Sequence, residues 1–283
     1  MVIWASGRGR AAALVALAWA VCCEGSSNAA TSRLADAVSP TSRAPVLVAI
    51  DPGHGGTNLG AAGPIHGLYE KNVTLALAER VQALLADPGE SADSPTIAVL
   101  LCRNSDELVP IRARARCAAE TGARLFITLH ANAVPPGVSP QAQNGYEIFV
   151  LGPREVEDDV ALAALAERND ARAAFAAHQV RASAEQSIRL AGVLSRHLTR
   201  ELGASGWRGV KQSGAALDVL RGARTAAVLV EVGFLSHPAE GARLMTSAGR
   251  EPIARALAAG IRAFVDTPST HLSAAKPLPA AQR

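Results

Sequence analysis

The sequence has no large excess of charge of either sign. Its 283 residues include 28 Lys and Arg against 25 Asp and Glu, which leaves a formal net charge of +3 at pH 7. So small an excess does not support a nucleic-acid partner, and we expect none. Lysine is scarce as well: Lys71, Lys211 and Lys276 are the whole complement, and the other basic side chains are arginine. Together with the abundant alanine, this indicates a GC-rich coding bias rather than a functional basic patch.

The N-terminal apolar run is too short for an ordinary transmembrane helix, which needs about 20 apolar residues. It extends from Ala11 to Cys23, follows Arg8 and Arg10, and precedes a stretch of small residues. That order is typical of a secretory signal. We therefore predict a signal peptide over residues 1–29, export to the periplasm or cell wall, and no transmembrane segment in the mature chain.

The end of this signal leaves two alternatives open. Cleavage fits after Ala20 or after Ala29, and Cys22 and Cys23 offer a lipoprotein alternative in which a cysteine carries the anchor. The residues at 19–21 make a poor lipid-attachment signal, so we expect an exported protein without a lipid.

Cysteines are few, and the four present show no zinc-finger or C-x-x-C spacing. Removal of the signal leaves Cys102 and Cys117. An oxidising compartment would allow them to pair, and the alternative is two separate buried thiols. Because both lie in apolar periodic segments, we favour separate thiols.

The rest of the composition, 49% hydrophobic and 19% charged, is sufficient for a sizeable core. Residues 30–44 are rich in Ser, Thr, Ala and Pro, which predicts a linker. Residues 267–283 are predicted to form a flexible tail. We found no internal repeat, so we expect one folded domain over residues 45–266.

Predicted strands and helices alternate within this domain. Short apolar runs predict strands, and longer runs with apolar residues at helical spacing predict helices. This pattern predicts an α/β fold with a mostly parallel, twisted sheet and helices on both faces. The expected strands are 46–50, 96–102, 123–131, 145–151 and 226–234, and the expected helices are 70–86, 108–122, 184–202 and 250–265.

Polar residues stand where three of these strands end, which is where open α/β sheets bind ligands. His54 follows the first strand, His130 ends the third, and Glu231 lies near the end of the last. Glu70 opens the first helix, where an acidic residue is also favoured by the helix dipole. Each histidine alone is better explained as a hydrogen-bonded core or rim residue.

Glu231 is harder to explain as ordinary structure, because an ionised carboxylate within an apolar strand is costly unless it is paired or binds a cation. Two histidines and one glutamate form a donor set used by catalytic zinc. A further carboxylate nearby can act as a general base. The four residues His54, Glu70, His130 and Glu231 are therefore candidates for one site.

The sequence resembles the zinc-dependent N-acetylmuramoyl-L-alanine amidases of the amidase-3 type in four motifs, "IDPGHGG", "YEKNVTLALAERVQALL", "LFITLHANA" and "VLVEVGFLSHPAE". The resemblance extends over residues 46–265. It implies a peptidoglycan hydrolase that cleaves the amide between N-acetylmuramic acid and the L-alanine of the stem peptide. It also implies that His54, Glu70 and His130 bind Zn²⁺, and that Glu231 takes a proton from the zinc-activated water and passes it to the leaving nitrogen.

Three features near these motifs leave alternatives open. Asn132 either orients the substrate or a ligand, or only closes its strand. His237 stands where many relatives have asparagine, and we interpret it as a loop substitution. The middle of residues 152–179 is predicted to be helical. Relatives often carry a helix here, which in some covers the zinc site and supplies an inhibitory carboxylate, but here Asn169 replaces that acid. We hypothesise weak gating by residues 155–178, with a solvated acidic face as the alternative.

Two rival functions remain. A zinc carboxypeptidase acting within the stem peptide would share His54, Glu70 and His130. An inactive relative that binds peptidoglycan would have lost a ligand or the base, and none is lost here. No cell-wall-binding repeat is recognisable, so targeting depends on the catalytic groove, on a partner such as a protein activator, or on a lipid.

Overall fold

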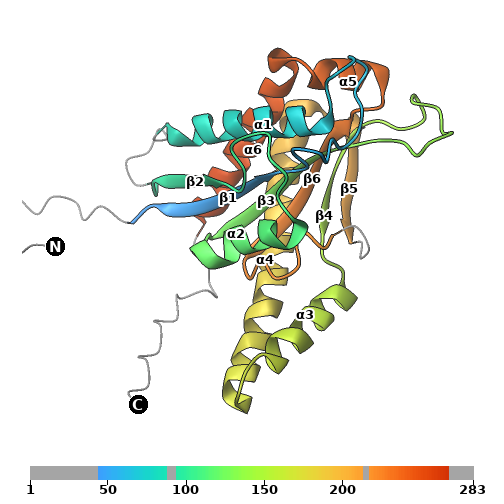
Figure 1. Ribbon diagram of the computed structural model, residues 1–283. Coiled ribbons are helices and arrows are strands. Elements are labelled where there is room, and N and C mark those ends of the chain that lie inside the picture. Colours follow the sequence, from blue (N-terminus) through green and yellow to red (C-terminus); the bar gives the residue numbers. More distant parts are fainter. Residues whose placement is uncertain (1–43, 88–93, 213–216, 268–283) are drawn as a thin grey trace, which may run out of the picture. The chain divides into compact units, whose positions relative to one another are not determined.

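The structure is a computed structural model (Figure 1), and it describes residues 44–87, 94–212 and 217–267. The predicted signal peptide, nearly all of the predicted linker and all but the first residue of the predicted tail lie outside the described residues. Within these three ranges no helix combines the length and apolar character needed to span a bilayer.

Six strands of the described chain form one sheet, in the order β2-β1-β3-β6-β4-β5. Strands β2, β1, β3 and β6 run parallel to one another, whereas β4 is antiparallel to β6 and parallel to β5. The prediction of a mostly parallel sheet is confirmed. The strands are β1 Val46–Pro52, β2 Ile97–Leu101, β3 Leu125–Asn132, β4 Tyr146–Val150, β5 Trp207–Gln212 and β6 Ala226–Phe234.

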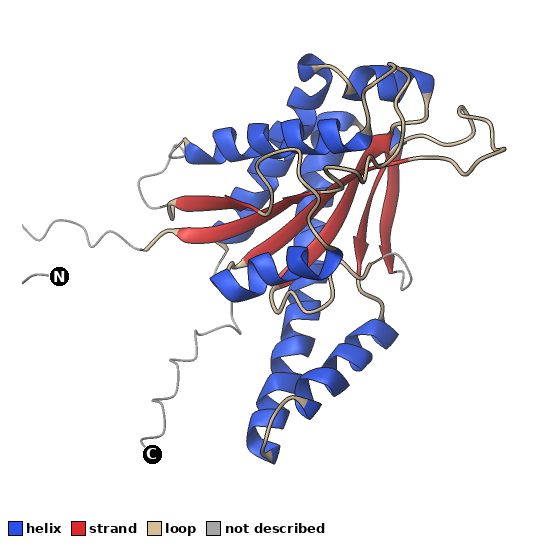
Figure 2. Cartoon of the chain, viewed as in Figure 1, coloured by secondary structure: helices blue, strands red, loops and turns tan. Residues whose placement is uncertain are grey.

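Helices cover both faces of this sheet (Figure 2), as predicted. Helices α1, α4 and α6 pack on one face, and α2 packs on the other together with residues 217–223. The helices are α1 Glu70–Ala86, α2 Ile111–Thr121, α3 Pro153–Leu165, α4 Asp170–Leu202, α5 Pro238–Leu244 and α6 Ser247–Asp266, with a 3-10 turn at Ala204–Gly206.

Strand alternation decides which face bears each side chain. In β3, Leu125, Ile127 and Leu129 belong to the core under α1, α4 and α6, whereas Phe126 belongs to the core under α2. His130 stands an even number of residues after Phe126 in β3. Its side chain therefore projects on the same face of the sheet as Phe126, the face that α2 covers. The same parity in β6 places Glu231 with Leu229 on the α2 face.

The sequence pattern missed two elements. The strand β5, "WRGVKQ", is a polar edge strand whose side chains are mostly half-buried or exposed, so no apolar alternation marks it. The short helix α5 has only 7 residues. In addition, α4 begins at Asp170, before the apolar spacing that marks it from Ala184 onward, because its first turns lie against α3 rather than in the core.

The preference for separate thiols was wrong. Cys102, next to the end of β2, and Cys117 in α2 form a disulfide with a Cα–Cα distance of 5.8 Å. Cys102 also packs against the core under α2. A disulfide is accommodated by apolar surroundings as well as a thiol is. The apolar periodicity of the two segments therefore could not distinguish a disulfide from two separate thiols.

Candidate metal centre and catalytic carboxylate

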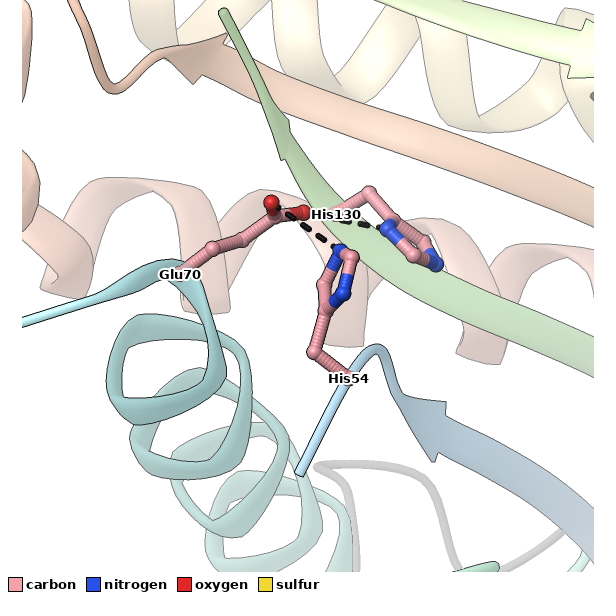
Figure 3. Close-up of side chains that lie close together, drawn as sticks. All are labelled: His54, Glu70 and His130. Atoms are coloured by element: carbon pink, nitrogen blue, oxygen red, sulfur yellow. Dashed lines mark hydrogen bonds and ion pairs between the residues drawn. The ribbon is translucent and has the colours of Figure 1, made fainter. Parts of the chain in front are cut away.

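The three predicted metal ligands converge at the carboxyl ends of β1 and β3 (Figure 3). One donor atom of each of His54, Glu70 and His130 lies within 4.8 Å of the others. Glu70 stands between the two histidines: its Oε2 lies 3.0 Å from His54 Nε2, and its Oε1 lies 3.0 Å from His130 Nδ1. The structure therefore brings together on one small surface the donor set that catalytic zinc uses.

Glycines around this cluster allow backbone to approach the donor side chains closely. A Cβ on Gly53 would lie 2.5 Å from His130 Cε1, and a Cβ on Gly60 would lie 2.6 Å from Glu70 Oε2. His54 itself has a φ of +62°, a left-handed conformation that non-glycine residues adopt rarely and mostly at functional sites. The glycine-rich segment after β1 is thus required by the packing of the cluster.

Second-layer hydrogen bonds orient the ligands. Asn58 Oδ1 accepts a hydrogen bond from His54 Nδ1 at 2.9 Å. Because this oxygen can only accept, the Nδ1 atom carries a proton, which leaves Nε2, the atom beside Glu70, as the nitrogen that could bind a metal ion. The backbone amides of Ala61 and Ala131 each donate to the Glu70 carboxylate at 2.9 Å. Sequence reasoning missed Asn58, although it stands four residues after His54, just beyond the motif "IDPGHGG".

Two buried arginines hold the loop that carries His54. Arg114 of α2 is ion-paired with the fully buried Asp51 at 2.7 Å and donates to the carbonyl oxygens of Pro52 and His54. Arg103 donates to the carbonyl oxygens of Pro52 and Gly53. These arginines satisfy carbonyls that a strand end would otherwise leave unpaired in the protein interior. Nothing in the local sequence distinguished them from the many other arginines.

The charges of the cluster are strongly coupled. Burial raises the pKa of a carboxyl, but the hydrogen bonds from His130 and His54 outweigh it and hold the pKa of Glu70 well below its usual range. Burial opposes the charged form of His54, yet its hydrogen bond and attraction to Glu70 raise the pKa of His54 above the ordinary value. The Glu70 carboxylate is therefore ionised and attracts positive charge to this position.

Glu231 lies directly beside the cluster. In the sheet register it is the partner of His130 in β3 on one side and of Glu147 in β4 on the other. Its Oε2 atom is buried and has no hydrogen-bond partner in the described chain. Burial, together with the charges of Glu70 and Glu147, raises the pKa of Glu231 well above its usual range. An orphaned carboxylate oxygen next to three converging donors fits a site that takes up a cation and a water molecule.

Glu147 is a second acidic residue that sequence reasoning missed. Its side chain is buried, and its Oε1 atom accepts a hydrogen bond from Asn132 Nδ2 at 2.8 Å. Its Oε2 atom lies 3.1 Å from Arg208 Nε and 2.5 Å from Lys211 Nζ. Asn132 therefore contacts Glu147 rather than one of the three predicted metal ligands, and its role in orienting the substrate or a ligand stays a prediction. The motif "GYEIFVL" contains Glu147, but only the tertiary structure shows its proximity to Glu231.

Two other predicted features have structural outcomes. His237 caps helix α5, where its Nδ1 accepts from the backbone amide of Glu240, so its interpretation as a loop residue outside the cluster agrees with the structure. The hypothesis of weak gating by residues 155–178 is not supported by their position. Because β4 is antiparallel to β6, the helix α3 that follows it starts at the opposite edge of the sheet (Figure 1). A cavity of 790 Å³ at that edge is lined by α2, α3 and α4 and by none of the predicted site residues.

Fold and site together define the class of the protein. The chain is an open α/β domain with a two-histidine, one-glutamate donor set at the carboxyl edge of its sheet, next to a buried carboxylate. This is the donor set of mononuclear zinc hydrolases.

The family follows from comparison with known proteins. The family model for N-acetylmuramoyl-L-alanine amidase matches residues 48–263. AmiA of Salmonella typhimurium is 33% identical over 232 residues, which cover 77% of this chain and 75% of that protein. AmiA of Escherichia coli is 32% identical over the same length. The chain belongs to the amidase-3 type N-acetylmuramoyl-L-alanine amidase family, and the predicted family is confirmed.

Solved structures agree with this assignment. The catalytic domain of CwlV from Bacillus (Paenibacillus) polymyxa is 27% identical with a TM-score of 0.58, over 78% of this chain and 98% of that chain. AmiC2 of Nostoc punctiforme is 26% identical with a TM-score of 0.59 over the same shares. The chain spans about half the length of some relatives, such as 52% of AmiB from Haemophilus influenzae and 54% of AmiC from Neisseria meningitidis.

Proposed function

We propose that this protein is a zinc-dependent hydrolase that cleaves the amide between N-acetylmuramic acid and the L-alanine of the peptidoglycan stem peptide. The convergence of His54, Glu70 and His130 carries the proposal, since these three side chains would hold the ion. Membership of the amidase family supports the substrate. The residue set fits zinc because nitrogen and carboxylate donors meet around one point and an adjacent carboxylate oxygen has no partner.

Glu231 has the position and environment of the general base. Zinc, when bound, lowers the pKa of a coordinated water and polarises a carbonyl group. Glu231 then accepts the proton of the attacking water and delivers it to the amide nitrogen, which leaves poorly unless it is protonated. Burial limits competing solvation of the carboxylate, and its raised pKa suits a group that accepts a proton and then returns it.

The site does not by itself select this bond over a peptide bond within the stem. A zinc carboxypeptidase would use the same ligands, so the products must separate the two reactions. An inactive, peptidoglycan-binding relative is disfavoured because all four predicted site residues are present and assembled.

We also propose that the protein is exported and that its catalytic domain comprises residues 45–266. The signal pattern over residues 1–29 supports export, and the family match over residues 48–263 supports the domain. Targeting to the wall would then come from the catalytic surface or from a protein partner.

The deciding experiment incubates the purified chain from about residue 30 with isolated sacculi and analyses the soluble products by mass spectrometry. Free stem peptides that begin with L-alanine are expected from the wild type, together with an intact glycan. Glu231→Gln should reduce release by at least about a hundredfold, because glutamine cannot accept the proton. It should still bind one equivalent of zinc.

A matched control is Glu157→Gln, which removes an exposed carboxylate that pairs with Arg181 in the α3–α4 hairpin. It should release peptides at the wild-type rate. Peptides lacking the N-terminal L-alanine would contradict the proposed bond, and full activity of Glu231→Gln would contradict the proposed base.

A further inference from the structure

Strand β5 presents two cations on the sheet face that bears Glu231. In a regular strand, residues three positions apart point to opposite faces, so Arg208 and Lys211 would diverge. The register between β5 and β4 shifts by one residue here, and Gly209 has a φ of +100°. This bulge brings both side chains to one face, where Arg208 Nε and Lys211 Nζ contact the same oxygen of Glu147.

The three charges leave a net positive charge beside the proposed base. Glu147 is buried and is the register partner of Glu231 in the neighbouring strand. One carboxylate faces two cations, and the side chains of Arg208 and Lys211 are 31% and 40% exposed. The positive charge is thus open to solvent, next to the position where the reaction occurs.

The two cations differ in how firmly they are held, although each keeps two unused N–H donors. Arg208 donates through Nε to Glu147, through Nη1 to the carbonyl oxygen of Asn144 and through Nη2 to Gln143 Oε1, which fixes the guanidinium in place. An ammonium group has three N–H donors. In the described chain, the hydrogen-bonding partner of Lys211 is Glu147 alone. Lys211 therefore holds donors that are available to a ligand.

The chemistry of the substrate indicates which ligand this is. In the intact substrate the lactyl carboxyl of muramic acid is consumed in the scissile amide, so the carboxylates nearby belong to the peptide. We propose that Lys211, held in place by Glu147, binds a carboxylate of the stem peptide, that of the residue after L-alanine. This inference rests on the proposed function and adds to it a determinant of substrate specificity.

The test compares two synthetic muramyl peptides that differ only at the residue after L-alanine, which carries either a free carboxylate or a carboxamide. The wild type should prefer the carboxylate by about tenfold in kcat/KM, as expected for one charged hydrogen bond. Lys211→Gln should abolish this preference by raising KM for the carboxylate substrate, with little change in kcat. Lys211→Arg should retain part of it.

Arg255→Gln is the matched control, because it also removes a cation from an exposed ion pair, with Glu201, outside the site. It should leave both substrates unaffected. Zinc content and thermal unfolding of Lys211→Gln should match the wild type, since Arg208 and Asn132 still compensate Glu147.

Equal losses on both substrates, a loss confined to kcat, or no preference in the wild type would overturn the role of Lys211. In each of these cases, cleavage of the carboxamide substrate by the wild type would still support the proposed amidase activity, because that substrate contains the same scissile amide. If neither substrate is cleaved, the proposed function fails first. Calorimetry with the two free stem peptides then still decides the role of Lys211. If Lys211 binds the carboxylate, Lys211→Gln should lose affinity for the carboxylate peptide and keep its affinity for the carboxamide peptide.

Discussion

At the scale of single residues, the proposed metal site depends on the orientation of side chains as much as on their identity. His54 adopts a left-handed backbone conformation, Gly53 and Gly60 leave room for the donors, and Asn58 sets the protonated nitrogen of His54. Each of these features helps to bring the donor atoms of His54, Glu70 and His130 together. Residues that would not bind the ion themselves would therefore contribute to its affinity.

Asn58→Ala should weaken zinc binding by about 10- to 100-fold, the usual cost of losing a second-layer partner of a ligating histidine. The imidazole of His54 would lose the acceptor that fixes its tautomer and ring orientation. Competition with a chromophoric chelator measures the zinc affinity directly. Asn104→Ala, in an exposed loop, serves as the control and should bind zinc as the wild type does. Unchanged affinity in Asn58→Ala would contradict this account of the second layer.

Arg114→Met should destabilise the fold by about 3–5 kcal/mol, because it leaves the buried carboxylate of Asp51 without its charged partner. It also removes a donor to the carbonyl oxygen of His54. Chemical denaturation of both proteins gives the difference in the free energy of unfolding. Arg112→Met, an exposed change in the same helix, should stay within about 0.5 kcal/mol of the wild type. A similarly small effect of Arg114→Met would show that Asp51 is neutral or solvated.

At the scale of secondary-structure elements, the direction of β4 decides what surrounds the site. A parallel β4 would have brought the following helix to the edge that carries His54 and His130. The antiparallel β4 instead places its amino end there, which brings Glu147 beside Glu231 and sends α3 to the other edge. The bulge in β5 then adds two cations to the same face.

The disulfide links two elements near the site, since Cys102 lies next to the end of β2 and Cys117 lies in α2, the helix that carries Arg114. Replacing both cysteines by alanine should cost about 3 kcal/mol, as expected for a closed loop of this length. The separation of the two cysteines is 15 residues. Unfolding curves with and without a reductant measure the effect: the reductant should shift the wild type and leave the double variant unchanged. Identical curves for the wild type would contradict a disulfide in solution.

At the scale of the whole molecule, the proposed metal would join parts of the chain that are distant in sequence. His54 follows β1, Glu70 opens α1, and His130 belongs to β3. The two carboxylate oxygens of Glu70 now contact both histidines. A ligand that binds only the folded chain stabilises it in proportion to the logarithm of its free concentration.

Chelation should therefore lower the melting temperature, and zinc should restore it. Free zinc at a hundred times its dissociation constant would stabilise the fold by about 2.7 kcal/mol. Scanning calorimetry at several zinc concentrations measures this dependence. A His54→Ala/His130→Ala variant is the control and should show no response to zinc. An equal response of that variant would place the bound metal elsewhere.

The sequence by itself determined the alternation of strands and helices and the family, and it supplied four candidate site residues. These depend on local signals: apolar runs that end in polar groups, and short motifs that contain the donors. Only the tertiary structure decided that Glu147, Asn58 and the arginines Arg103 and Arg114 support the site, that the cysteines pair, and that α3 lies away from the cluster. The physical reason is that strand direction, register and a bulge are set by contacts between residues far apart in the chain, which no local pattern records.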